Sequence, residues 1–104
     1  MMYKIFFFCP ADHTEKVKEA MFEAGAGRLG NYQRCSWQTM GMGQFEAIEG
    51  ANPFLGNIDK LETVQEYKVE MLVSEADLDH TVEALKKAHP YEEPAWEVYK
   101  IHLK

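Results

Sequence analysis

The sequence predicts an α+β fold in which two helices cover one face of an antiparallel β-sheet. Two segments repeat apolar residues at the period of a helix, and each lies between segments rich in the aromatic and β-branched residues typical of strands. The length of 104 residues suits a single small domain, residues 1–104, with a modest core. The hydrophobic content of 46% is ordinary for a globular protein.

The first strand is expected over residues 3–9, whose alternate positions are apolar on both faces. Such a strand should be central and covered on both sides. Asp12 and Glu15 then resemble a capping box at a helix start, and Gly25 suits the end of that helix. Apolar residues recur between these signals at helical spacing: Val17, Ala20, Met21 and Ala24.

A glycine-rich loop is expected over residues 25–31, directly after the first helix. A phosphate cradle opens a helix, where backbone N–H groups are free, whereas this loop closes one and lacks the Lys-Ser/Thr ending of a P-loop. Glycines that permit left-handed backbone at a helix end explain the loop better. Arg28 within it is a candidate for binding a carboxylate or phosphate group.

Strand-like segments fill the middle of the chain. We expect a second strand over residues 32–40, a turn or bulge at residues 41–43 and a partner strand over residues 44–49. Residues 50–57 contain glycine and proline and indicate a loop. Residues 63–73 form a long expected strand. One of its faces is apolar: Tyr67, Val69, Met71 and Val73.

The second helix is expected to begin at Ser74 and Asp77, which resemble a cap, and to end before Pro90. Its apolar stripe consists of Leu78, Val82, Leu85 and Ala88. The last strand is expected over residues 95–103. The order is β-α-β-β-β-α-β, and treating the hairpin around residues 41–43 as an extra element leaves the ferredoxin-like pattern β-α-β-β-α-β.

Two helices can cover only one face of this sheet, yet large apolar side chains are expected on both. Phe6 and Phe8, together with Trp96 and Val98, are expected to point away from the face that carries Phe7 and Tyr99. Burying each such side chain is worth roughly 1.5–3 kcal/mol. We therefore expect a second subunit to cover the open face. The alternative is that the long hairpin folds back over it within one chain.

The charge pattern limits the partners of this protein. The net charge is −6 and the lysines are scattered, which argues against a nucleic-acid partner because such surfaces need clustered Lys and Arg. No apolar run approaches the length of a membrane span, and the apolar start is too short for a signal peptide. Two cysteines are too few for a disulfide framework. These features predict a cytoplasmic protein without a membrane partner.

The segment 89–94 has the most concentrated chemistry, because it holds an imidazole, a phenol and two carboxylates together with two prolines that stiffen it. Such groups suit zinc, manganese or iron, so His89, Glu92 and Glu93, with His13 as a distant partner, are candidate ligands of a divalent metal ion. In the structural interpretation, His89 and Glu92 instead hold the loop by hydrogen bonds to backbone, and Tyr91 anchors a subunit contact. This interpretation is favoured, since metal sites normally need three or four convergent ligands.

No catalytic residue is predicted. Cys9 and Cys35 have the surroundings of small buried hydrophobic residues rather than of nucleophiles. Nucleophile and base do not form a recognisable motif in this sequence.

Several strings resemble the inserted domain of the Nif-three-like (YqfO) dinuclear-metal proteins, often labelled GTP cyclohydrolase type 2 homologues. They are Ala24–Gly27, Gly30–Tyr32 with Cys35, Gly41–Phe45, Gly50–Pro53 and, most specifically, His89–Ala95. The resemblance covers nearly the whole chain and implies a CutA/PII-like ferredoxin fold, a trimer and a bacterial cytoplasm. In larger members, this domain lies between two halves that carry the metal ligands. We expect the present chain to be the insert alone, without that dinuclear site.

Three functions follow from these observations, in order of preference. The first is a non-enzymatic, oligomeric binding or regulatory module that holds a small molecule in clefts between subunits. Its candidate ligand contacts are Arg28, His89, Tyr91 and Glu92. The second is a metal-binding protein that uses the loop 89–93. The third, suggested by the family label alone, is a metal-dependent hydrolase.

Overall fold

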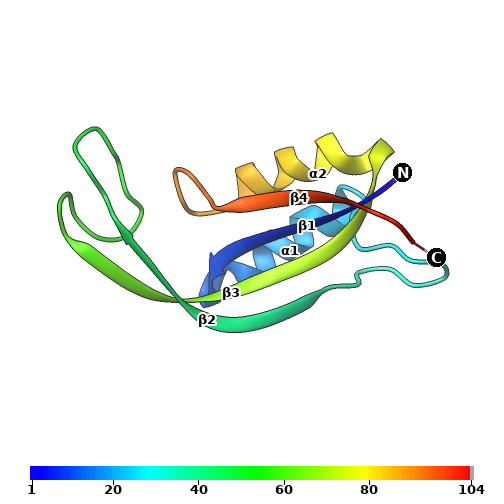
Figure 1. The fold of residues 1–104 in the computed structure, drawn as a ribbon, viewed down its shortest axis with the longest axis horizontal. Helices are drawn as coiled ribbons and strands as arrows, with labels where there is room; N and C mark the ends of the chain where they lie inside the picture. The colour runs from blue at the N-terminus through cyan, green and yellow to red at the C-terminus, as the bar shows by residue number, and fades with distance from the viewer. Residues whose placement is uncertain (104) are drawn as a thin grey trace.

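The computed structural model describes residues 1–103 and shows two helices packed on one face of a four-stranded antiparallel sheet (Figure 1). The elements in chain order are β1 (Met2–Pro10), a short 3-10 helix (Ala11–His13), α1 (Thr14–Glu23), β2 (Trp37–Glu46), β3 (Leu61–Ser74), α2 (Glu75–Ala88) and β4 (Trp96–Ile101). The strand order across the sheet is β2-β3-β1-β4. The predicted α+β class with both helices on one side is confirmed.

The core lies between the sheet and the two helices. The central strand β1 contributes Ile5, Phe7 and Cys9, each with no exposed surface. They meet buried side chains from the other elements: Val69, Met71 and Val73 of β3, Val17 and Met21 of α1, and Leu85 of α2. Alternation along β1 and β3 thus places one apolar set under the helices, as the sequence predicts.

The prediction of a turn or bulge at residues 41–43 is wrong, because β2 runs through these residues without a break. Gly41 lies opposite Glu66 and Gly43 opposite Val64 in the ladder with β3. A glycine inside a strand often marks a close approach rather than a turn, and a Cβ atom at Gly43 would collide with the Glu66 carboxylate. The glycines therefore leave room for a neighbouring side chain and do not reverse the chain.

The extra hairpin is instead an extension of two sheet strands. Residues 66–74 of β3 pair with β1, whereas residues 61–70 pair with β2. Residues 42–46 and 61–65 consequently pair only with each other and form a two-stranded arm that projects beyond the sheet (Figure 1). The loop 47–60 closes this arm.

The expected faces of β4 are also reversed. Trp96 lies opposite Phe7 and Val98 opposite Ile5, so both side chains face the helices, because directly opposed residues share a face. Tyr99 lies on the open face, where its ring centroid is 5.5 Å from that of Phe6. Period-two alternation separates the faces of a strand but does not say which one meets the helices.

The open face exposes less apolar surface than the sequence predicts. Phe6 is only 6% exposed, although neither helix covers it. Its neighbours on the same face shield it: the rings of Phe8 and Tyr99 pack against it, and Lys68 Nζ lies 4.5 Å from its ring centroid. Apolar side chains at the margin stay open to solvent, with Trp37 62% and Tyr99 54% exposed.

The observed ends of helices and strands differ from the sequence-based predictions in three further places. Asp12 lies in the 3-10 helix and does not cap α1, whose first residue Thr14 donates a hydrogen bond from Oγ1 to the Pro10 carbonyl, at 3.0 Å. Ser74 does occupy the N-cap position of α2, but its Oγ donates to the Asp77 carboxylate at 3.2 Å. Residues 32–36 are not strand, and β2 begins at Trp37.

Two expectations about helix ends are confirmed. Gly25, Gly27 and Gly30 all have positive φ, which explains the glycine-rich loop after α1 as a series of left-handed positions. The helix α2 ends at Ala88, and His89 is extended before Pro90, as the residue preceding a proline should be. Within residues 1–103, no helix combines the length and apolar character needed to cross a membrane.

Replacing Gly27 by alanine should destabilise the fold more than the same change at Gly30. Both glycines have left-handed backbone, where a Cβ atom costs about 1–2 kcal/mol. At Gly27 the added atom would also meet the Phe22 ring at 2.7 Å, whereas at Gly30 it meets nothing. Overpacking should add about 1–3 kcal/mol to the loss at Gly27. Urea unfolding of both variants measures the difference, and equal losses would contradict this account.

Candidate functional site

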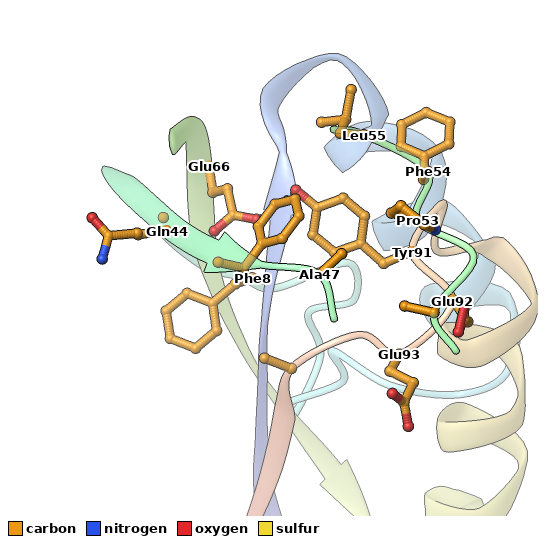
Figure 2. A pocket seen from close by; sticks show the side chains of 14 residues that line it. Phe8, Gln44, Ala47, Pro53, Phe54, Leu55, Glu66, Tyr91, Glu92 and Glu93 are labelled. Carbon is orange, nitrogen blue, oxygen red and sulfur yellow. Dashed lines mark hydrogen bonds between the residues drawn. The ribbon is translucent and has the colours of Figure 1, made fainter. Parts of the chain in front are cut away.

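A hollow lies where the two-stranded arm leaves the sheet (Figure 2). Its volume is about 350 Å³. Four segments form its walls: the end of β1 at Phe8, the base of the arm, the loop 47–55 and the segment 91–95. The last segment belongs to the proline-flanked loop that the sequence singled out.

His89 fixes the start of that loop through both ring nitrogens. Its Nε2 lies 2.7 Å from the Phe8 carbonyl oxygen, and its Nδ1 lies 3.1 Å from the Tyr91 amide nitrogen. A carbonyl only accepts and an amide N–H only donates, so Nε2 carries the proton and Nδ1 accepts. The ring is 6% exposed, and burial lowers the pKa of His89 below its usual 6.5. The imidazole is therefore neutral and held in one tautomer.

Tyr91 forms the centre of the pocket wall. Its hydroxyl donates a hydrogen bond to Glu66 Oε2 at 2.9 Å, and the two side chains point toward each other in Figure 2. Burial, followed by this bond and the charge of Glu66, raises the pKa of Tyr91, so the phenol stays protonated. Its ring lies among other aromatic rings, with centroids 6.0 Å from Phe45 and 6.3 Å from Phe54.

Glu66 lies on the open face of β3 and reaches over β2 because Gly43 has no side chain. The Glu66 carboxylate occupies the space that a Cβ atom at Gly43 would take. Strand alternation explains its direction, since Tyr67 and Val69 alternate between faces with Glu66 and Lys68. The glycine and the glutamate thus act together to place a carboxylate at the pocket wall.

Glu92 joins the two loops that border the pocket. Its Oε2 accepts a hydrogen bond from the backbone N–H of Asn52 at 2.7 Å, although the two residues are 40 positions apart. Glu93 is exposed and lines the same pocket. His89 and Glu92 therefore bond to backbone groups, which is the arrangement that the structural interpretation of this loop expects.

The other predicted site residues lie apart from this cluster. Arg28 is exposed next to Gly27, whose amide bonds to the Leu72 carbonyl at the far end of the sheet from His89. Within one chain, Arg28 thus does not join His89, Tyr91 and Glu92. His13 lies closer: its Nδ1 is 3.0 Å from Asp12 Oδ1, and its ring packs on Phe54 at 5.3 Å.

The four residues predicted as metal ligands do not converge on one point. Among residues 1–103, no group of three or more His, Cys, Asp or Glu side chains is placed to hold a metal ion. Both nitrogens of His89 are already bonded, and Glu92 faces Asn52. The metal site over His13, His89, Glu92 and Glu93 stays a prediction, and these positions do not form it without rearrangement.

The cysteines do not contribute to the pocket. Cys9 is completely buried under the helices, and burial raises the pKa of its thiol to about 11. A thiol that stays protonated is a poor nucleophile. Cys35 is partly buried in the loop before β2, where its amide bonds to the Gly27 carbonyl.

Sequence reasoning missed several residues of the pocket wall. Gly43 was assigned to a turn or bulge, Phe54 to a loop, and Phe45 and Glu66 to strands, none of them with a role in a site. Alternation in β3 does put Glu66 opposite the apolar face, but only the register with β2 shows that it meets a glycine. Phe54, half exposed in a loop of glycine and proline, was the one signal available in the sequence.

The fold places this protein among structures of the CutA kind. It superposes on CutA from Archaeoglobus fulgidus with a TM-score of 0.71 at 17% identity, covering 100% of this chain and 87% of that one. CutA from Xylella fastidiosa gives a TM-score of 0.70 at 19% identity. At such identity the likeness establishes the fold.

A narrower relationship comes from proteins related to NIF3. The Bacillus cereus member matches with a TM-score of 0.80 at 37% identity, over 94% of this chain and 25% of that one. Among curated proteins, the "GTP cyclohydrolase 1 type 2 homolog" of Halalkalibacterium halodurans is 45% identical over 100 residues, and that of Bacillus subtilis 35% over 98. No protein-family model matches the chain.

These matches confirm the resemblance for one domain. The chain is similar, over 96% of its length, to a segment that makes up 27% of the Halalkalibacterium protein. The relatives are thus much longer than the region they share with this chain.

Acid should destabilise the fold through His89. Its folded pKa lies below the unfolded value of 6.5, so the unfolded chain binds more protons and stability falls as the pH drops below about 6.5. Protonation would also convert Nδ1 from an acceptor into a donor, so that it would face the Tyr91 N–H donor without forming a hydrogen bond. Urea unfolding should show a lower midpoint at about pH 5.5 than at about pH 7.5.

The variant His89→Gln should flatten that pH dependence and cost about 1–3 kcal/mol at neutral pH, because a buried backbone group loses its partner. His80→Gln removes an exposed histidine and serves as the control. An unchanged pH profile in His89→Gln would show that other groups cause the acid sensitivity.

Proposed function

We propose that this protein is a non-enzymatic, self-associating module that binds a small ligand in the pocket around Tyr91. One observation carries the proposal: three long-range hydrogen bonds within the chain hold the pocket walls in place. They join His89 to Phe8, Tyr91 to Glu66 and Asn52 to Glu92. A pocket formed in advance spares a ligand the cost of ordering it.

The chemistry of the pocket supports binding over catalysis. A general base needs a free lone pair and a pKa near the working pH. His89 uses both nitrogens to hold the loop, and Tyr91 donates to Glu66 with a raised pKa. These two residues are thus engaged in shaping the pocket. The enzyme name carried by relatives applies to proteins of which this chain matches about a quarter, and we do not transfer it.

Self-association is supported by the open face of the sheet. Trp37 and Tyr99 remain more than half exposed at its margin, around the buried ring of Phe6. Apolar side chains of this size on one flat face favour a partner surface. The resemblance to the CutA/PII-like fold suggests that the partner is a second copy and that the assembly is a trimer.

The variant Trp37→Glu should weaken self-association. Size exclusion with light scattering on the wild type should give an oligomer, and the variant should shift toward the monomer at equal concentration, since a carboxylate would be buried at the contact. Leu29→Glu changes an exposed apolar residue away from the sheet and should keep the wild-type mass. A wild-type monomer across a wide concentration range would end the self-association part of the proposal.

A fragment screen by protein-observed NMR tests the pocket directly. Bound fragments should shift the signals of Tyr91, Phe54 and Phe45 rather than signals spread over the surface. Phe54→Ala removes an aromatic wall that is half exposed, and should weaken binding about tenfold. Leu61→Ala, on the arm outside the pocket, should have no effect. Absence of hits in the pocket would contradict the binding proposal.

A further inference from the structure

We propose that the ligand of this pocket is a small organic cation, an ammonium group attached to an apolar body. This inference rests on the proposed function and specifies the chemical class of its ligand. Three features of the pocket carry it: the sign of its charges, its aromatic walls and the free oxygen of Glu66.

The charge of the pocket has one sign. Its ionisable side chains that bear a charge are all carboxylates, from Glu66, Glu92 and Glu93, and no Lys, Arg or His is among the described residues that line it. His89, behind Tyr91, is neutral through its two hydrogen bonds. An anion would face three carboxylates without a compensating base, whereas a cation would be attracted.

The aromatic walls suit the same ligand. Rings of Phe8, Phe45, Phe54 and Tyr91 surround the hollow, and the face of an aromatic ring attracts a cation. The molecule already uses this pairing next to the pocket, where Lys68 Nζ lies 4.5 Å from the ring centroid of Phe6. The same rings would hold the apolar body of the ligand. An inorganic metal ion would use neither the rings nor the apolar surface.

Glu66 supplies an oriented acceptor. The Tyr91 hydroxyl donates to Oε2 and fixes the carboxylate, while Oε1 lies over Gly43 and accepts no hydrogen bond from residues 1–103. Because the phenol is neutral, the negative charge of Glu66 is not cancelled. An ammonium N–H can donate to Oε1 from inside the pocket. Since such a bond is charge-assisted, it is stronger than one between neutral groups.

The size of the pocket limits the ligand. Its volume of about 350 Å³ lies near the lower end of small-molecule sites, which span roughly 300–1,000 Å³. A single ring with a short aminoalkyl chain is of suitable size. A nucleotide would carry the wrong charge.

Three probes of similar shape and different charge test this inference on the full chain. They are 2-phenylethylamine as the cation, 2-phenylethanol as the neutral analogue and phenylacetate as the anion, each titrated by NMR at neutral pH. The amine should bind about tenfold more tightly than the alcohol, and phenylacetate should bind most weakly.

Glu66→Gln keeps the shape and the acceptor for Tyr91 but removes the charge. It should weaken binding of the amine about tenfold and leave that of the alcohol nearly unchanged. Glu93→Gln changes an exposed position and should therefore leave the fold intact. It should also weaken binding of the amine. Glu23→Gln removes the same charge on an exposed position of α1 and should have no effect.

The outcomes separate this inference from the proposed function. If the alcohol or phenylacetate shifts the pocket signals as strongly as the amine, the pocket binds ligands but the cation inference is overturned. Equal losses in Glu66→Gln and Glu23→Gln would overturn it too, because the attraction would then come from net charge. If none of the three probes binds, the inference fails, and the fragment screen decides whether the pocket binds anything.

Discussion

The short hydrogen bond between the His89 imidazole and the Phe8 carbonyl is the contact on which the pocket depends. Phe8 is near the end of β1, and its N–H bonds to the Ala95 carbonyl just before β4 begins. His89 thus bonds to the central strand beyond the point where its pairing with β4 ends. Through the same ring it holds the amide of Tyr91, which in turn reaches Glu66 on β3. One side chain therefore ties the end of α2 to two strands and sets the position of the pocket wall.

That contact has a cost that the surrounding residues offset. A buried imidazole loses its hydration, and only a neutral ring with both nitrogens bonded is tolerated at such a site. The prolines at positions 90 and 94 restrict the backbone of the loop, so less entropy is lost when it is ordered. Glu92 then secures the loop 47–60 against it. The side chains of His89 and Glu92 bond to backbone groups, which is why the residues of this loop do not gather as metal ligands.

The sequence predicts the fold well because the fold depends on local periodicity. Alternation in β3 and the apolar stripe of α2 identify the core correctly, and Pro90 marks the end of that helix. The predictions for the two faces of β4 and for a break in β2 were wrong for a common reason. Both depend on which residues of distant strands lie opposite each other, and a pattern within one strand carries no such information. The site was predictable only in part: His89, Tyr91 and Glu92 stand out in a proline-containing string, whereas Glu66 becomes a pocket residue only because the register of β3 with β2 puts its carboxylate over Gly43.

The order of strands in the sheet has a consequence for how this chain is made. The central strand β1 is synthesised before both of its partners, β3 and β4, with Met2 opposite both Ser74 and Ile101. Contacts between such distant positions are slow to form, because closing a long loop costs entropy before any pairing is gained. On the ribosome, the aromatic residues of β1 stay unpaired until β3 emerges, and their pairing is complete only after β4 follows. The sheet of this domain is thus completed only once β4 has been made, and until its partners form, β1 is a segment exposed to aggregation or in need of a chaperone.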